Sequence, residues 1–260
     1  FKVLTVLVLL PAAAALPSRD TLFASVTPGG KTAEFVPVQP SLKDISGMSY
    51  VGDGTFLTVH DMKGYENLAW PRVSLVQLAF NLSIGLQLAD VVYDLNDWPT
   101  DRTCTREKDG KTYTYTGPND LESVAGIPGK LNQALLCEST NSRHDQPVAD
   151  RIYLAEVSLS KGSNGAPNGG SVSIKDHTSF STFTHSHNVE GTAIAAYGSS
   201  TDKIKKYLFL WGERNEAIIH WADLVLEPKL VIGKQIIGNE SFNISSFAPW
   251  SNRPVVGLDI

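Results

Sequence analysis

The 260-residue chain has few of the features that mark several large protein classes. It contains two cysteines, two methionines and 19% charged residues, and its formal net charge is -5. Its Lys and Arg residues form no basic cluster, so nucleic acid is not expected as a partner. The one long apolar run lies at the N-terminus, which excludes a multi-span membrane protein. With 42% hydrophobic residues, the rest of the chain can bury one large core or two small ones.

The first 16 residues are typical of a secretory signal peptide. Lys2 precedes an apolar run at 3–10, and four alanines follow at 12–15. A membrane anchor is the alternative, but the apolar run is shorter than the ~20 residues that span a bilayer. We therefore expect a secreted, extracellular protein that has no membrane association once the leader is cleaved.

Secretion would expose the chain to glycosylation and to an oxidising compartment. Three sequons, at Asn81, Asn239 and Asn243, predict a glycoprotein. Cys104 and Cys137 can pair in a disulfide bond under these conditions, and two unpaired buried thiols are the alternative. Neither cysteine has another Cys or a His at the spacing of zinc ligands.

The chain after the leader reads as all-β. Short apolar runs alternate with Gly, Pro, Asn and Asp, and hardly any segment has helical periodicity. A short motif recurs at 44–50, 120–126 and 188–194, and a fourth copy begins within 255–260. Such self-similarity indicates a repeat architecture.

Three further strand-like segments follow each motif copy. Four consecutive antiparallel strands form one blade of a β-propeller, so the motif segments 45–50, 121–126 and 189–194 are predicted to be the innermost strands. Residues beyond the length of a typical blade are assigned to loops at 94–118 and 160–170. A β-sandwich with irregular strands is the competing architecture, but it does not explain the repeat.

A propeller closes on itself, whereas this chain has no initiator Met and ends inside its fourth motif copy. We therefore expect residues 17–260 to be a C-terminally incomplete propeller domain. Six blades would need roughly 420 residues. Two strand-like runs within 21–38 are expected to help close the ring.

The repeat would bring carboxylates to one end of a central channel. These acids lie at three kinds of position: the start of a motif, its third position and the end of the second strand of a unit. They are Asp44 and Asp120, then Glu122 and Glu190, then Asp61, Glu138 and Glu213. Converging carboxylates repel one another unless a cation or proton lies among them. Calcium suits such a site because it takes six to eight oxygen ligands. For any one of these acids alone, a turn cap or a solvated side chain is the favoured interpretation. The set as a whole favours a shared site, because turn chemistry does not require Glu after Leu121 and again after Val189.

The motifs resemble those of a known family. They are Asp44-Ile-Ser-Gly-Met, Asp120-Leu-Glu-Ser-Val, Glu138-Ser-Thr with Arg151-Ile-Tyr, and Val189-Glu-Gly-Thr-Ala with Leu210-Trp-Gly-Glu-Arg. They are similar to the repeats of the phytase-like β-propellers, which are also described as having esterase-like activity, and to the related SdiA-regulated propellers. The first motif departs from the pattern, with Ser46 where the next two have Glu. The resemblance implies a calcium-binding propeller that hydrolyses phosphate or carboxylic esters.

Calcium-assisted hydrolysis of a small-molecule ester substrate would need metal ligands, a general base and positively charged side chains that hold the substrate oxygens. Glu122, Glu190, Asp44 and Glu213 are the candidate metal ligands, and Asp120 and Glu138 are further ligands or the general base. His187 is a candidate for proton transfer, as is His60, and Arg143 or Arg214 would hold substrate oxygens. No Gly-x-Ser-x-Gly motif supports a serine esterase. A non-catalytic propeller that binds a ligand or a protein remains the alternative.

Overall fold

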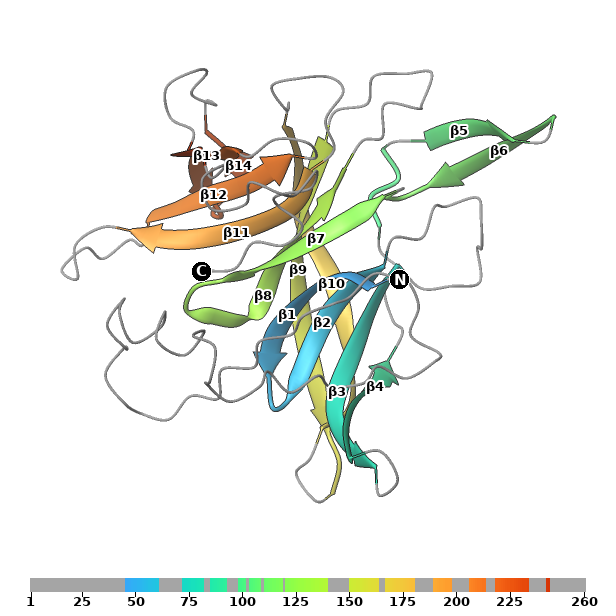
Figure 1. Cartoon of the computed structure of the whole chain (residues 1–260), viewed down its shortest axis with the longest axis vertical. Helices are drawn as coiled ribbons and strands as arrows, with labels where there is room; N and C mark the ends of the chain where they lie inside the picture. The colour runs from blue at the N-terminus through green and yellow to red at the C-terminus, as the bar shows by residue number, and fades with distance from the viewer. Residues whose placement is uncertain are drawn as a thin grey trace, which may run out of the picture.

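The computed structural model describes the chain in thirteen ranges, and every regular element in them is a β-strand (Figure 1). The ranges are 45–60, 72–81, 85–92, 98–101, 103–108, 110–118, 120–139, 150–163, 167–180, 189–197, 206–213, 218–233 and 242–243. The expected all-β class is confirmed. These ranges hold no helix long and apolar enough to cross a membrane. The predicted leader, the run at 21–38 and the fourth motif copy lie outside them.

Three antiparallel sheets carry the three repeats, and the first four strands of each sheet pair in the order in which they follow one another in the chain. The first sheet contains β1 (Ile45–Gly52), β2 (Thr55–His60), β3 (Val73–Asn81) and β4 (Gly85–Val92). The second contains β7 (Leu121–Ile127), β8 (Lys130–Glu138), β9 (Asp150–Lys161) and β10 (Pro167–Phe180). The third contains β11 (Val189–Tyr197), β12 (Lys206–Glu213), β13 (Ile218–Val225) and β14 (Val231–Ile232). The predicted four-strand units, each beginning with a motif segment, are confirmed.

Two segments predicted as loops contain strands instead. Within 94–118, β5 (Thr103–Lys108) and β6 (Lys111–Thr116) form a hairpin that projects away from the three sheets (Figure 1). Gly110 adopts a positive φ of 70° at its two-residue turn, a conformation that glycine adopts without strain. Within 160–170, β9 and β10 continue pairing as far as Lys161 and Pro167.

The fourth strand of the third sheet comes in two described pieces. β14 pairs with the end of β13, and β15 (Phe242–Asn243) pairs with the start of β13. Both pieces run antiparallel to β13. The strand expected near 229–237 therefore begins at Val231, and a second piece follows further along the chain.

The second sheet packs between the other two. On β8, Leu135 and Cys137 belong to a buried cluster shared with the third sheet, whereas Ala134 and Leu136 belong to a cluster shared with the first. Successive side chains of a strand point to opposite faces, so this one strand supplies two cores. That double role explains why the end of β8 is apolar at consecutive positions.

Cys137 is a free, fully buried thiol, so the predicted disulfide bond with Cys104 is not formed in the structure. The physical reason is the direction of the side chain. Cys137 points into the core between the second and third sheets, close to Ile152. Cys104 lies on β5, which pairs only with β6 and belongs to neither of those sheets.

The three motif strands lie side by side although each belongs to a different sheet. β7 runs between β1 and β11 (Figure 1). Ser46 Oγ donates a hydrogen bond to the carbonyl oxygen of Leu121 at 2.6 Å, and Ser123 Oγ lies 2.8 Å from Thr192 Oγ1. A Cβ at Gly47 would lie 2.7 Å from the Val124 nitrogen, so glycine is what allows β1 and β7 to approach this closely.

Candidate functional site

A β-bulge recurs at the third motif position in all three sheets. The pairing jumps from Ile45 to Gly47, from Leu121 to Ser123 and from Val189 to Gly191. The skipped residues are Ser46, Glu122 and Glu190, the same three positions that the sequence repeat aligns. A bulge leaves its extra residue out of the ladder and turns that side chain away from the regular alternation, and bulges are frequent beside functional sites.

Pairing with the first strand shows which second-strand residues are equivalent in the three sheets. The residue before each bulge pairs with His60 in the first sheet, Glu138 in the second and Glu213 in the third. The prediction that Asp61 is the equivalent of the two glutamates is therefore wrong, because it matched the acids that end the apolar runs, whereas pairing with the first strand decides which residues are equivalent. Asp61 itself lies outside the described residues.

Each of these second-strand residues bonds a buried polar group of its own sheet. His60 Nε2 lies 2.6 Å from Ser74 Oγ, and the Tyr153 hydroxyl donates to Glu138 Oε2 at 2.6 Å. In the third sheet, Trp211 Nε1 donates to Glu213 Oε1 at 3.2 Å. Buried polar groups need such partners. Sequence reasoning missed them, although strand register puts Ser74 and Tyr153 at equivalent places on the third strands.

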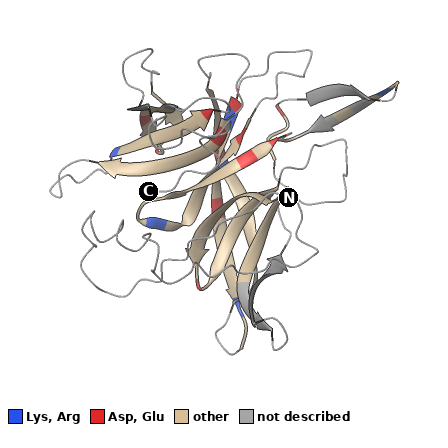
Figure 2. Ribbon diagram, viewed as in Figure 1, with Lys and Arg blue, Asp and Glu red and all other residues tan. Residues whose placement is uncertain are grey.

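Six carboxylates are buried in the described part of the chain, where the buried set contains no Lys or Arg. They are Asp120, Glu122, Glu138, Asp150, Glu190 and Glu213. Figure 2 shows acidic positions, in red, on β7 and toward the end of β12. Burying several carboxylates is costly unless partners, protons or cations offset their charge.

The pKa of the Cys137 thiol is affected by the same buried carboxylates. Burial raises its pKa well above the ordinary value, and the carboxylates of Asp150 and Glu138 raise it further. Glu122 adds to this effect, while a hydrogen bond from Ser123 opposes it. The acids of β7, β8 and β9 therefore act on one small region of the core.

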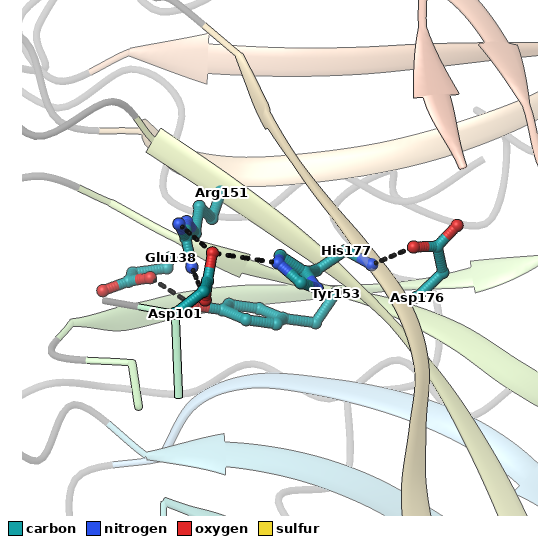
Figure 3. A network of polar contacts seen from close by, with 6 residues as sticks. All are labelled: Asp101, Glu138, Arg151, Tyr153, Asp176 and His177. Carbon is teal, nitrogen blue, oxygen red and sulfur yellow. Dashed lines mark hydrogen bonds and ion pairs between the residues drawn. The ribbon is translucent and has the colours of Figure 1, made fainter. Parts of the chain in front are cut away.

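A second polar network lies at the edge of the second sheet (Figure 3). Arg151 donates two hydrogen bonds of 2.9 Å to the carboxylate of Asp101 and holds its pKa at about 2. His177 Nε2 lies 3.3 Å from the same carboxylate. Asp176 accepts a hydrogen bond from the backbone N–H of Leu230 at 2.7 Å, which ties β10 to the third sheet. None of these residues was a predicted site residue, although Arg151 begins one of the motifs quoted from the sequence.

Five of the nine predicted site residues lie in the described part of the chain, and all five are buried near the bulged ends of the sheets: Asp120, Glu122, Glu138, Glu190 and Glu213. The other four lie outside it: Asp44, Arg143, His187 and Arg214.

The donor set has the right chemistry for calcium, because its described members are all carboxylates. Glu122 and Glu190 lie on the neighbouring strands β7 and β11. The described residues nevertheless hold no group of three or more His, Cys, Asp or Glu side chains arranged to bind a metal ion. A calcium site would therefore need donors beyond those described.

No protein-family model matches the chain, and no curated protein sequence matches it. The resemblance to the phytase-like propellers therefore rests on the motifs alone.

Proposed function

We propose that the three sheets are blades of a β-propeller whose motif strands surround its axis. Three features support this arrangement. Each sheet is a meander of consecutive strands, the sheets pack face to face, and β7 contacts both β1 and β11. In a propeller the bulged ends of the first strands would gather around one axis.

We propose that the bulged ends of the motif strands bind a divalent cation, with calcium as the first candidate. The observation that carries it is the repeated bulge at Glu122 and Glu190 on neighbouring strands. Both side chains are buried, at 6% and 8% exposure, in the part of the chain that the structure describes. Calcium can accept carboxylate ligands from several strands because its geometry is flexible. Asp44, which directly precedes β1 in the sequence, is a further ligand proposed for this site.

Thermal unfolding of the full chain, in calcium and in chelator, tests this proposal. A cation that binds only the folded state stabilises it by about 2.7 kcal/mol at a concentration of 100 times Kd. Glu122→Gln and Glu190→Gln should each remove most of the calcium-dependent shift. Glu227→Gln is the matched control, since this side chain is 75% exposed and pairs with Lys130. A wild-type melting temperature that calcium does not change would overturn the proposal.

Hydrolysis of phosphate or other esters is the activity proposed for this site. The motif resemblance supports it, and Asp120 and Glu138 are the carboxylates proposed as general base. The residues proposed to move a proton or hold substrate, His187, Arg143 and Arg214, lie outside the described residues. Bound calcium would neutralise negative charge on substrate oxygens. A panel of phosphate and carboxylic esters, assayed with calcium and with chelator, should give turnover that requires calcium and falls in Glu122→Gln.

A non-catalytic propeller that binds a ligand or a protein partner is the second candidate. The observation that favours it is the position of Glu138, whose residue is 1% exposed and whose carboxylate accepts a hydrogen bond from Tyr153. That contact holds the carboxylate inside the second sheet instead of presenting it to a substrate. Calcium binding without turnover of any ester would support this candidate over the hydrolase.

We also propose that the protein is secreted and glycosylated, as the leader and the sequons suggest. Asn81 is the last residue of β3, Asn243 is the last residue of β15, and Asn239 lies outside the described residues. Expression through a eukaryotic secretory pathway should give a product in the medium that loses mass on deglycosylation. A product retained in cells, or one without glycan, would contradict the proposal.

A further inference from the structure

Arg151 is the centre of a polar network on the second sheet that the proposed cation site does not use (Figure 3). Its Nη1 and Nη2 atoms donate hydrogen bonds of 2.9 Å to the two carboxylate oxygens of Asp101. His177 Nε2 lies 3.3 Å from one of these oxygens. Two parallel bonds from one guanidinium are the arrangement in which arginine binds both carboxylates and phosphates. The network therefore has the geometry of an oxyanion site with an internal carboxylate in it.

The two halves of this site come from different parts of the fold. Arg151 lies on β9 and His177 on β10, which are paired strands of the second sheet. Asp101 belongs to the strand-free segment 98–101, which precedes the hairpin of β5 and β6. The Arg151 side chain is 12% exposed, whereas that of Asp101 is 49% exposed. The cationic half is thus built into the sheet, and the carboxylate reaches it from the solvent side.

Trp98 keeps Asp101 close to Arg151. Its ring packs edge-to-face on Tyr153 with the ring centroids 5.3 Å apart, and a Cβ at Gly117 would lie 3.3 Å from its Cβ. A carboxylate tethered in this way has an effective concentration on the order of millimolar. A free anion must therefore compete with Asp101 for the guanidinium.

The site adjoins Glu138, one of the carboxylates proposed as general base. Glu138 and Arg151 pair directly across β8 and β9. Directly opposite residues project from the same side of a sheet, with their Cβ atoms about 5 Å apart. The Tyr153 hydroxyl donates to Glu138 and also accepts a hydrogen bond from Arg151. A ligand group held by Arg151 would therefore be bound by the immediate neighbour of Glu138.

We propose that Arg151 and His177 form a binding site for the phosphate group of a ligand, and that Asp101 occupies this site in the free protein. A phosphate offers the guanidinium two oxygens, as the carboxylate does, and has a third for His177. The inference rests on the proposed function, to which it adds a substrate-binding arginine within the described residues. If no ester is hydrolysed, the same site would serve the non-catalytic ligand-binding candidate.

Calorimetric titration with inorganic phosphate, in chelator and at constant ionic strength, tests this site. Asp101→Ala should bind phosphate roughly tenfold or more tightly than the wild type, because the tethered competitor is gone. The variant should fold, since Asp101 is 49% exposed, and phosphate should raise its melting temperature. Adding Arg151→Gln should remove both effects. Adding Arg151→Lys should keep only part of the gain, because an ammonium group does not form the two parallel bonds.

Two results would overturn the inference. One is a phosphate affinity that is the same in the wild type and in Asp101→Ala. The other is a gain that persists when Arg151→Gln is added, since the phosphate would then bind elsewhere.

Glu227→Ala is the matched control for the loss of one negative charge beside a cation. Glu227 Oε1 lies 2.7 Å from Lys130 Nζ, in an exposed ion pair that lacks the two parallel bonds. This variant should keep the phosphate affinity of the wild type. A gain equal to that of Asp101→Ala would show a general effect of charge and overturn the inference.

The phosphate titration needs neither calcium nor turnover, so its failure and the failure of the cation site can be told apart. A phosphate gain in Asp101→Ala together with a chain that binds no calcium would uphold the phosphate site and remove the cation site. Calcium binding without any phosphate gain in Asp101→Ala would uphold the cation site and overturn the phosphate site.

Discussion

The Tyr153 hydroxyl donates a 2.6 Å hydrogen bond to Glu138 Oε2, and both residues are only 1% exposed. Tyr153→Phe removes this donor from a buried carboxylate, which typically costs about 1–3 kcal/mol. Urea unfolding should show that loss. Tyr197→Phe is the control, because its bond to Asp223 is exposed, and it should change stability by less than about 0.5 kcal/mol. Equal losses in the two variants would contradict this role for Tyr153.

Asp101 should make the free energy of unfolding decrease in acid. Its hydrogen bonds from Arg151 lower its pKa from 3.8 to about 2. A carboxyl whose folded pKa is depressed stabilises the protein above its unfolded pKa, and that contribution is lost as pH falls from about 4 to 2. Because the side chain is 49% exposed, solvent screening keeps the contribution below about 1 kcal/mol.

The test is thermal unfolding of wild type and Asp101→Asn between pH 6 and pH 2. The wild type should be the more stable protein at pH 6, and the difference should vanish near pH 2. A difference that stays constant across this range would show that the ionised carboxylate is not what stabilises the contact.

Two glycines at the junction of β1 and β7 should differ in their tolerance of alanine. At Gly47 a Cβ would meet the backbone of Val124 at 2.7 Å, and backbone cannot move away without separating the strands. At Gly126 it would meet only the Ser49 hydroxyl, also at 2.7 Å, which can rotate. Gly47→Ala should therefore cost about 2 kcal/mol or more and Gly126→Ala clearly less, as measured by urea unfolding. The reverse order would contradict the close approach of the two strands.

Cys137 should be inert in the folded protein. Burial, Asp150 and Glu138 all raise its pKa, so little thiolate is present, and reagents cannot reach it. In a Cys104→Ser variant, which leaves Cys137 as the sole thiol, a thiol reagent should react only after denaturant is added. Full reaction under native conditions would show that the thiol is accessible.

The sequence was sufficient to predict the repeats, because the apolar runs and turn residues that set strand order are local features. The motif strands at 45–50, 121–126 and 189–194 lie where they were predicted. The hairpin of β5 and β6 was missed even though Asp109-Gly110 is a common hairpin turn. Its strands are rich in Thr, Lys and Arg, so the search for apolar runs passed over it.

The site was harder to predict, because it depends on register across strands. His60, and not Asp61, is the equivalent of Glu138, because His60 pairs with Ile45 as Glu138 pairs with Leu121. The same limit applies to Cys137, whose direction follows from its place on β8 and not from its distance to Cys104 in sequence. The partners Tyr153 and Ser74 come from a third strand, which no pairwise motif could align.

Calorimetric titration of calcium into the full-length chain tests the central claim most directly. The account predicts heat of binding in the wild type, with Glu122→Gln and Glu190→Gln each weakening the affinity and Glu227→Gln leaving it unchanged. The two weakened variants should show little further loss when combined, because both residues would serve one ion. A wild-type chain that gives no heat with calcium would contradict the cation site and the calcium-dependent hydrolase built on it.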